Sequence, residues 1–421
     1  MKPASLSNSA EAAFAEIVGR EHVLAALADS ITGLHPRFIV EPGTERELSS
    51  ALRLANDANL AAIPRGGGTK INWGNPPARA DLILSTARLN KIIEHAWADL
   101  TVTVEAGCTI ATLQAALAQH GQRLELDPLW PEKATIGGVL STNDSGALRL
   151  RFGALRDLII GVTLALPDGT LASSGGKVVK NVAGYDLPKL VTGALGTLGV
   201  ITRAVFRLHP LPRNSSTFSI SPRNFEQAQR LLSALLDSKL AHTALQARIA
   251  GDSQPILDIL FEGTEAGIAE QVAQAKKMAE STAFVESPAT VWGARQKLWD
   301  DSDSATIAKV CILPAQFART SELMQRTTEA HQAGWQFVMQ ATGIGWLRLE
   351  GAAQNLHAVL FELRSQFERD GGSLVILRRP SEMPTMDAWG QPSDALPLMR
   401  AVKHRFDAKN TLNPGRFVGG I

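Results

Sequence analysis

Three glycine-rich segments lie close together in the first half of this chain of 421 residues. They are PRGGGT at 64–69, ATIGG with STNDSG between 134 and 146, and NVAGYDLPKLVTGALGTLGVIT at 181–202. Each lies next to an apolar run that is typical of a β-strand. Glycine has no Cβ and tolerates positive φ, so such loops bring backbone N–H groups close to an anionic ligand. The spacing therefore predicts a site for a large phosphate-bearing molecule.

The composition excludes several other classes of protein. Net charge is +1, with 45% hydrophobic and 20% charged residues, so no overall charge favours nucleic acid or an anionic membrane. Cys108 and Cys311 are the two cysteines, too few for a disulfide framework or a thiolate metal cluster. We see no secretory signal, no apolar run of about 20 residues and no internal repeat. We expect a cytoplasmic protein without direct membrane insertion, or one peripheral to the inner membrane face through partners.

The periodicity of the apolar residues predicts an α+β fold. Helices are expected within 11–30, over 44–60, where Thr44 and Glu47 form a capping box, and over 109–121. Residues 157–174 read as a hairpin, and residues 199–212 as a strand that ends at a pair of prolines. This pair predicts a domain boundary at residue 212, followed by a second α+β region.

PRGGGT has the composition of a pyrophosphate-binding loop. Gly66, Gly67 and Gly68 would expose N–H groups, Arg65 would add charge, and Thr69 would add a hydroxyl. The segment is neither a Walker A loop nor the dinucleotide fingerprint, because its glycine spacing differs from both. A plain glycine turn is an equally good interpretation of this loop alone.

The second segment is rich in hydroxyl groups and glycines that suit a ribityl chain or a pyrophosphate. Its candidate ligand residues are Thr135, Gly137, Gly138, Ser141, Thr142 and Gly146. The alternative is a loop built on Asx turns. In the third segment Tyr185, the only tyrosine of the chain, would flank an aromatic cofactor ring or would be buried with a satisfied hydroxyl.

Taken together, these motifs resemble the FAD-binding domain of the vanillyl-alcohol oxidase type, also called the PCMH type. The resemblance covers roughly residues 32–212, and LNPGRF at 412–417 resembles the family's returning C-terminal segment. It implies a helical extension over 1–31, a two-subdomain FAD-binding domain over 32–212, an α+β cap over 213–385 and a returning segment over 386–421. Residues 177–202 are most similar to one branch, the FAD-binding E subunits of bacterial glycolate oxidases.

The resemblance assigns roles to individual residues. Residues 65–69 would hold the FAD pyrophosphate, and the six residues of the second segment would hold the ribityl-diphosphate side. Val200 and Ile201 would offer backbone groups to the adenine half. Asn413, with Pro414 and Gly415, would close over the isoalloxazine region.

Two departures from the family's pattern shape the expected chemistry. Covalent members carry a histidine where this chain has Thr69, so we expect non-covalent FAD. Catalytic 2-hydroxy-acid dehydrogenases of the family carry a clustered His-x-x-x-Glu-His element in the cap, whereas none of the nine histidines here lies within four residues of another. We therefore predict no metal site and assign no catalytic residue.

Some charged residues of the second region are weaker candidates. Arg295 beside Trp292, and Arg378 with Arg379, have the chemistry that grips a carboxylate. Packing of the tryptophans into the core and solvation of a strand end are the competing interpretations. Cys108 follows a strand and is expected to be a small buried apolar residue.

Three functions are compatible with these features. The first is a non-covalent FAD subunit of a glycolate oxidase-like complex, which oxidises a 2-hydroxy acid (glycolate to glyoxylate) together with a catalytic flavoprotein subunit and an iron–sulfur subunit. The second is a self-sufficient FAD-dependent 2-hydroxy-acid dehydrogenase. The third is a scaffold subunit with a vestigial flavin site.

Overall fold

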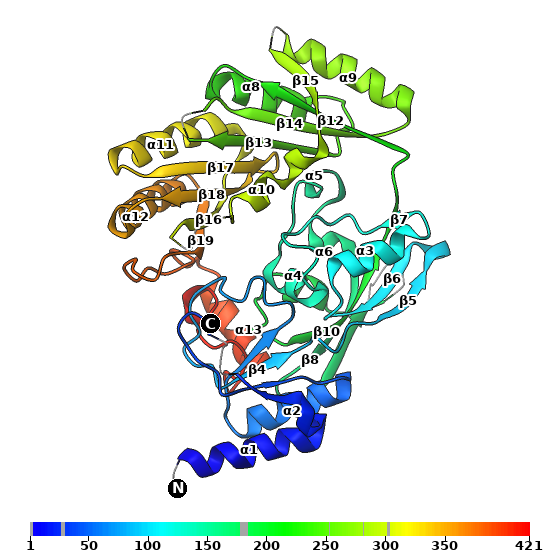
Figure 1. Ribbon diagram of the computed structural model, residues 1–421, viewed down its shortest axis with the longest axis vertical. Coiled ribbons are helices and arrows are strands. Elements are labelled where there is room, and N and C mark those ends of the chain that lie inside the picture. The colour runs from blue at the N-terminus through cyan, green and yellow to red at the C-terminus, as the bar shows by residue number, and fades with distance from the viewer. Residues whose placement is uncertain (1–2, 27–29, 177–183, 252, 281, 301–303) are drawn as a thin grey trace. The chain divides into compact units, whose positions relative to one another are not determined.

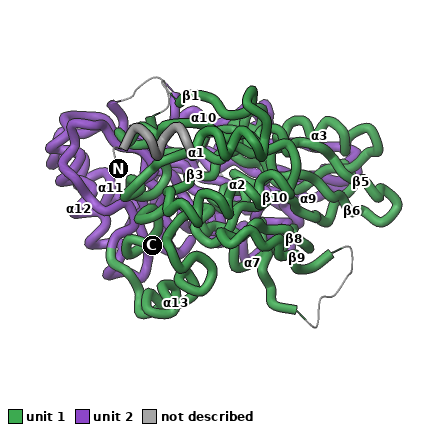
Figure 2. The backbone as a smooth tube through the Cα atoms, turned by 90° about the horizontal axis from the view of Figure 1, so that it is seen from below, with its two compact units in different colours: residues 1–145, 154–211, 391–421 green, residues 146–153, 212–390 purple. Residues whose placement is uncertain are grey.

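The structure, a computed structural model, describes residues 3–26, 30–176, 184–251, 253–280, 282–300 and 304–421. The chain forms two compact units, coloured separately in Figure 2. Unit 1 contains residues 1–145, 154–211 and 391–421, and unit 2 contains residues 146–153 and 212–390. The chain thus passes into unit 2 near the predicted boundary at residue 212. Residues 177–183 of the third glycine-rich segment lie outside the described residues.

Unit 1 begins with a four-stranded sheet of mixed direction (Figure 1). The strand order is β1-β2-β4-β3, in which β1 is antiparallel and the other neighbours are parallel. The elements are α1 (Pro3–Val18), η1 (Arg20–His22), β1 (Val23–Ala25), β2 (Phe38–Val40), α2 (Glu45–Asp57), β3 (Ala62–Arg65) and β4 (Leu82–Ser85). The buried residues of both helices pack against this sheet in one core. The residues before 31 are thus helical only in part, since β1 joins the sheet instead of extending the helix.

The start of α2 shows how local chemistry fixes an element. Thr44 Oγ1 accepts the N–H of Glu47, and a Glu47 carboxylate oxygen accepts the N–H of Gly43 at 2.7 Å. The predicted reciprocal cap therefore forms, although the carboxylate reaches one residue further back than expected. The buried residues Leu48, Ala51, Leu52 and Ala55 follow the 3, 4, 7 spacing that places one apolar face on the sheet.

The second sheet of unit 1 has five antiparallel strands in the order β5-β6-β10-β8-β9. Its strands are β5 (Ile92–Ala96), β6 (Thr101–Glu105), β8 (Ile159–Ala165), β9 (Leu171–Gly175) and β10 (Val200–Arg207), and a separate pair joins β7 (Gln122–Arg123) to β11 (His209–Pro210). The predicted hairpin over 157–174 is confirmed as β8 and β9. The remaining helical elements of unit 1 are η2 (Trp97–Asp99), α3 (Ile110–Ala118), α4 (Ile136–Thr142), α6 (Leu155–Leu158), α7 (Leu187–Val191), α13 (Leu396–Phe406) and η5 (Val418–Gly420).

Unit 2 contains an eight-stranded antiparallel sheet whose order shows a duplication. The order β15-β12-β14-β13-β17-β18-β16-β19 joins two β-α-β-β-α-β halves, each of the split βαβ type. The first half is β12 (Asn214–Ser221), α8 (Phe225–Asp237), β13 (Ala244–Ala250), β14 (Ile256–Gly263), α9 (Glu265–Ala279) and β15 (Ala283–Ser287). The second is β16 (Thr306–Cys311), α11 (Phe317–Ala330), β17 (Gly334–Gln340), β18 (Ile344–Glu350), α12 (Ala353–Arg369) and β19 (Ser373–Arg378). The sequence, which shows no internal repeat, did not predict this repeated topology.

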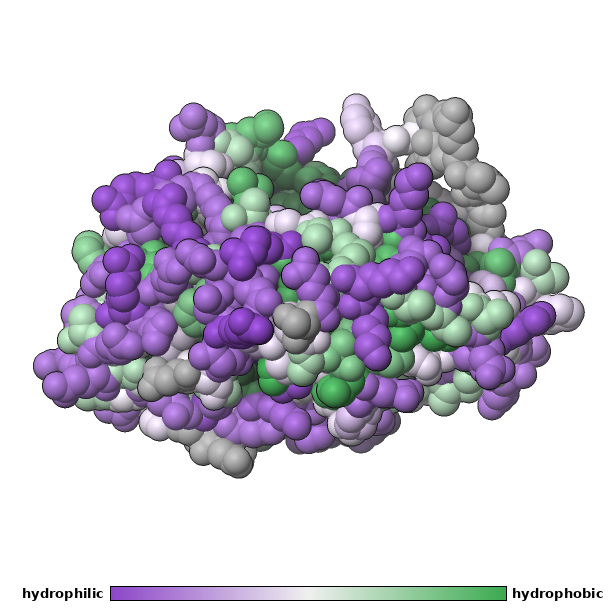
Figure 3. Space-filling view, turned by 90° about the horizontal axis from the view of Figure 1, so that it is seen from above, coloured by the Kyte–Doolittle hydropathy of each residue, from purple (hydrophilic) through white to green (hydrophobic). Residues whose placement is uncertain are grey.

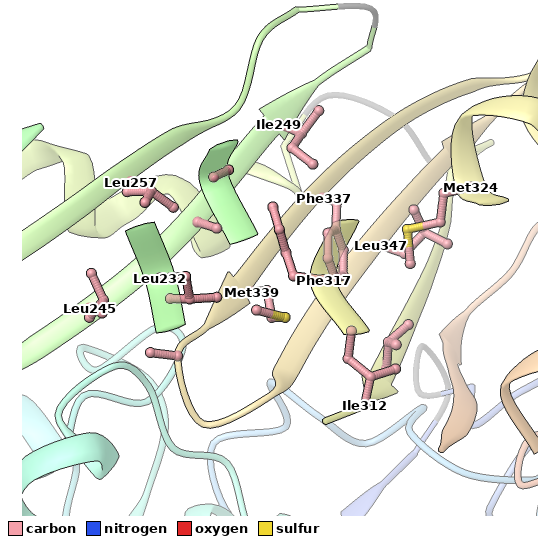
Figure 4. Packing of buried hydrophobic residues seen from close by; sticks show 14 of the residues in the cluster. Leu232, Leu245, Ile249, Leu257, Ile312, Phe317, Met324, Phe337, Met339 and Leu347 are labelled. Carbon is pink, nitrogen blue, oxygen red and sulfur yellow. The ribbon is translucent and has the colours of Figure 1, made fainter. Parts of the chain in front are cut away.

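The four long helices of unit 2 cover one face of its sheet (Figure 1). Figure 4 shows Leu232, Phe317 and Met324 pointing into the layer that also contains Phe337 and Leu347 of the sheet. The shorter elements of unit 2 are α5 (Arg149–Phe152), η3 (Ala289–Gly293), α10 (Ala294–Lys297) and η4 (Pro314–Gln316). The mixture of helices and strands in both units confirms the predicted α+β class.

The surface of the protein and the length and polarity of its helices bear on contact with a membrane. The face shown in Figure 3 is mostly hydrophilic, with apolar side chains scattered over it. Within the described ranges, every helix is too short or too polar to cross a lipid bilayer.

Candidate cofactor site

The glycine-rich segments of unit 1 meet at one cleft, which holds about 710 Å³ of space not occupied by atoms, open solvent included. Four stretches that are far apart in the sequence form its walls. The lining residues are Pro64, Arg65, Gly66, Gly67, Gly68, Thr69, Lys70, Ile71, Thr86, Thr135, Gly137, Gly138, Ser141, Thr142, Leu195, Gly199, Val200, Ile201, Asn413 and Arg416.

The glycine loop follows β3 and keeps its backbone donors available. Among the hydrogen bonds of the described residues, none uses the N–H groups of residues 66–69, whereas the Arg65 carbonyl accepts the N–H of Thr86 at 2.9 Å. Gly68 has φ of +72°, a conformation that glycine adopts without strain. A run of unused N–H groups beside a cleft is suited to bind phosphate oxygens.

The same glycines also satisfy a packing requirement. A Cβ added at Gly66 would overlap the Thr135 hydroxyl, and one added at Gly67 would overlap the carbonyl oxygen of Lys133. The loop therefore needs glycine for contact within the chain as well as for access by a ligand. Gly138 differs, because an added Cβ would meet only Thr135 Oγ1 at 3.2 Å.

Helix α4 presents its first turn to the cleft. Thr135 caps it by accepting the N–H of Gly138 at 3.4 Å, and Thr142 Oγ1 donates back to the Gly138 carbonyl at 2.8 Å. Gly137 lies against Ala106, which leaves room for a hydrogen atom but not for a side chain. The helix thus sits close behind the glycine loop, and its glycines keep the wall of the cleft open.

The C-terminal segment completes the cleft by pairing with the strand that precedes the glycine loop. The N–H of Ala62 donates to the Thr411 carbonyl at 2.8 Å, and the N–H of Asn413 donates to the Ala62 carbonyl at 3.1 Å. Asn413 Nδ2 donates to the Leu195 carbonyl at 2.6 Å, while its Oδ1 is buried without a hydrogen-bond partner. A buried acceptor without a partner is costly, which is consistent with a donor supplied by a ligand.

Two buried cations hold the C-terminal segment in place. Lys403 Nζ contacts Asp407 Oδ2 at 2.6 Å and donates to the carbonyls of Thr197 and Leu412 at 2.9 and 3.0 Å. Burial lowers the pKa of Lys403, an effect that Asp407 opposes. Arg416 donates to the carbonyls of Ile71 and Trp73, and burial lowers its pKa to about 10. Arg416 therefore stays charged at neutral pH and adds a positive charge to the lining.

Most of the predicted cofactor residues come together in this cleft. Thirteen of the fifteen line it: Arg65, Gly66, Gly67, Gly68, Thr69, Thr135, Gly137, Gly138, Ser141, Thr142, Val200, Ile201 and Asn413. Gly146 does not, since it belongs to unit 2. Tyr185 does not either: it is 91% exposed, so it is not the buried tyrosine of the alternative interpretation.

Several lining residues were not predicted from the sequence. Lys70 directly follows the glycine loop, and Arg416 directly follows the NPG turn, so position next to a motif is the signal that could have found them. Leu195 and Gly199 lie within the third segment but carry no polar side chain. Cys108 is buried as expected, and burial raises its pKa to about 11.

The arginines that were weak candidates for substrate binding are engaged within unit 2. The Arg295 guanidinium stacks over the Trp346 ring at 4.7 Å, and that of Arg378 lies over Trp299 at 5.5 Å. Arg379 donates to the Met386 carbonyl at 2.9 Å. Within the described ranges, no group of three His, Cys, Asp or Glu side chains is arranged to hold a metal ion.

Comparisons with known proteins agree with this geometry. Residues 36–175 match the family described as FAD binding domain. The glycolate oxidase subunit GlcD of Bacillus subtilis is 30% identical over 233 residues, which are 55% of this chain and 49% of that protein. The D-lactate dehydrogenase of Archaeoglobus fulgidus is 27% identical over 418 residues, which are 90% of this chain and 91% of that protein. The chain thus spans about half the length of the first relative and nearly all of the second.

Another curated relative and one solved structure extend these similarities. The D-2-hydroxyglutarate dehydrogenase of Xanthomonas citri pv. viticola is 25% identical over 91% of this chain and 89% of that protein. The structure of p-cresol methylhydroxylase with substrate bound superposes with a TM-score of 0.81 over 98% of this chain and 96% of that one, at 15% identity. At this identity the superposition shows the fold alone. Residues 36–175 thus match an FAD-binding domain, and FAD is the cofactor of this chain.

The residues of the cleft suit this cofactor. The unused N–H groups of residues 66–69 and the charges of Arg65 and Arg416 complement a pyrophosphate. The hydroxyls of Ser141 and Thr142 are also in the lining and suit a polyol. Thr69, the last residue of the glycine loop, adds a further hydroxyl to the lining.

Proposed function

We propose that this chain is the non-covalent FAD-binding subunit of a glycolate oxidase-like complex that oxidises a 2-hydroxy acid. In this proposal the chain is an FAD-dependent oxidoreductase. The observation that carries it is the cleft of unit 1, which is lined by the glycine loop, the first turn of α4 and the C-terminal segment. The names of two relatives, a glycolate oxidase subunit and a D-lactate dehydrogenase, support the substrate class.

Different residues of the cleft would bind different parts of the cofactor. Residues 66–69 would bind the pyrophosphate through their N–H groups, with Arg65 and Arg416 balancing its charge. Asn413 would meet the cofactor with its buried Oδ1, and Val200 and Ile201 would meet the adenine half. Bound FAD would supply a two-electron acceptor for the oxidation of a 2-hydroxy acid to a 2-oxo acid, in which the C2–H bond breaks and the hydroxyl proton passes to a base.

The involvement of partners rests on what unit 2 provides. Arg295 stacks on Trp346, and Arg348 donates to the carbonyls of Leu298 and Asp300 at 2.7 Å. Groups used in this way are poorly placed to grip a carboxylate. A catalytic flavoprotein subunit would therefore supply the base and substrate contacts, and an iron–sulfur subunit would take up the electrons. We place this assembly in the cytoplasm, peripheral to the inner membrane face through these partners.

The second candidate is a self-sufficient FAD-dependent 2-hydroxy-acid dehydrogenase. It is favoured by the two relatives named as dehydrogenases, which match along about nine-tenths of both sequences. This candidate requires a catalytic base within the chain, formed by residues that are distant from one another in the sequence.

A dye-linked oxidation assay separates the two candidates. Glycolate, D-lactate and D-2-hydroxyglutarate would be offered to the FAD-loaded chain alone and to the native assembly isolated through a tag on this chain. The subunit proposal predicts turnover by the assembly and none by the chain alone, although both contain FAD. Turnover by the isolated chain at the rate of the assembly would contradict the subunit proposal and establish the second candidate.

A further inference from the structure

A buried ion pair lies in the wall of the cleft, directly behind the glycine loop. Lys70 Nζ is 3.2 Å from Asp144 Oδ2, and the two side chains are 4% and 1% exposed. Lys70 is itself part of the cleft lining and is the first residue after the loop. None of the cofactor roles assigned above uses either residue.

The pair connects three separate segments that surround the cofactor site. Lys70 Nζ donates to the Leu129 carbonyl at 3.2 Å, and Asp144 Oδ2 accepts the N–H of Leu129 at 2.9 Å. The ammonium also lies 5.7 Å from the ring of Trp73 and 5.3 Å from that of Trp130. The glycine loop, the loop around Leu129 and the turn after α4 are therefore held together through one ammonium group.

We propose that the Lys70–Asp144 pair is a positioning element that fixes the glycine loop in the shape that binds FAD and keeps this wall of the cleft electrically neutral. The loop needs such a support because its own N–H groups on residues 66–69 make no hydrogen bond within the described chain. An unsupported glycine loop has a large conformational freedom to lose on binding. Because Lys70, the residue after the loop, is fixed by its ion pair, the loop has less conformational entropy to lose when FAD binds.

The charge balance distinguishes this role from a direct grip on phosphate. Asp144 offsets the charge of Lys70, so the pair by itself adds no net charge to the cleft. If Lys70 gripped the cofactor directly, removing Asp144 would free the ammonium and strengthen FAD binding. If the pair positions the loop, removing either partner weakens FAD binding.

The test uses Lys70→Met, Asp144→Asn, the double variant and Lys70→Arg in the full chain. FAD dissociation constants come from titration of flavin fluorescence with apo-protein, and unfolding midpoints of the apo-proteins show whether each variant folds. We expect Lys70→Met and Asp144→Asn each to weaken FAD binding by about ten-fold or more, because each leaves a buried charge without its partner. Lys70→Arg should retain most of the affinity, since it keeps the charge.

The midpoint potential of the bound flavin provides a readout that a purely structural role would not move. Asp144→Asn should raise the potential relative to the double variant, because the uncompensated ammonium favours the more negative, reduced flavin. An equal or lower potential would overturn the charge-balancing part of the proposal.

The double variant decides the outcome if a single variant fails to fold, because it leaves no unpaired charge. We expect it to be folded and to bind FAD more weakly than the wild-type chain. Affinity within about two-fold of wild type in the double variant, or tighter binding by Asp144→Asn, would overturn the positioning role. This inference rests on FAD as the cofactor and not on the proposed substrate or partners, so its failure is distinguishable from theirs.

Discussion

The cleft of unit 1 and two arginines of unit 2, Arg295 and Arg348, use their polar groups in opposite ways. In the cleft, the N–H groups of residues 66–69 and Oδ1 of Asn413 make no hydrogen bond within the described chain. In unit 2, Arg295 stacks on Trp346 and Arg348 donates to two carbonyls. Open donors and acceptors indicate a place for a ligand, whereas engaged ones indicate a structural role.

This difference explains why the cofactor could be identified and the substrate site could not. A site made of backbone groups needs glycines at fixed places, and these are visible in a sequence. An arginine that binds a carboxylate and one that stacks on a tryptophan look the same in a sequence. The following four experiments test the contrast, from the largest expected effect to the smallest.

Replacement of Lys403 by Met should have the largest effect on unit 1. The substitution leaves the buried carboxylate of Asp407 without its cation and removes donors to two carbonyls, so we expect a loss of about 3–5 kcal/mol in the free energy of unfolding. Chemical denaturation followed by two probes, one in each unit, measures it. Lys409→Met, an exposed lysine of the same segment, is the control and should stay within about 0.5 kcal/mol. A stable Lys403→Met variant with normal FAD binding would show that the C-terminal segment does not depend on this ion pair.

The substitution Gly138→Leu should block the cleft and leave the fold intact. An added Cβ meets only the Thr135 hydroxyl, so the new side chain is expected to occupy the space of the ligand. FAD affinity should fall about 100-fold or more, equivalent to about 2.7 kcal/mol, with little change in the unfolding midpoint. Gly293→Leu in unit 2, where a Cβ would have no neighbour within 4 Å, is the control. Unchanged FAD affinity in Gly138→Leu would refute the location of the site.

Two arginines allow a matched comparison of the units. Arg65→Met should weaken FAD binding by about ten-fold because the cleft loses a positive charge. Arg295→Met should leave FAD affinity unchanged and cost about 0.5–2 kcal/mol of stability through the loss of its contact with Trp346. FAD titration and thermal unfolding measure both effects. If the assembly with Arg295→Met folds normally but has a raised KM for the 2-hydroxy acid, Arg295 contacts the substrate and the contrast is wrong.

Acid should destabilise unit 2 through His242. Burial, and then the charge of Arg151, lower the pKa of this histidine below its ordinary value of 6.5. As the pH falls below about 6.5, the unfolded chain binds a proton that the folded chain does not, so stability decreases until the folded pKa is reached. His242→Gln should remove this part of the pH dependence. Denaturation curves between about pH 5 and 7 measure it, and an identical slope in both proteins would show that other groups are responsible.

The sequence predicted the features of this protein that depend on local chemistry. The cap of α2 at Thr44, the hairpin of β8 and β9, and ten cleft residues follow from hydrogen-bonding side chains, turn residues and glycines. Val200, Ile201 and Asn413 were assigned to the site by the family resemblance and not by local chemistry. The repeated half-sheets of unit 2 were missed, because two similar topologies can be built from unlike sequences whose apolar residues merely keep the right period. Lys70 and Arg416 were missed because their importance depends on partners distant in the sequence, such as Asp144 and the carbonyl of Ile71.

The visible spectrum of the chain purified alone, recorded anaerobically before and after addition of glycolate, would be the most direct measurement. A non-covalent FAD subunit whose substrate chemistry depends on partners should show an oxidised flavin spectrum that glycolate leaves unchanged. The flavin should be released when the protein is denatured. Bleaching of the flavin by glycolate would contradict this, because it would mean that the chain contains a complete active site. A chain that binds no flavin under any condition would contradict the cofactor site itself.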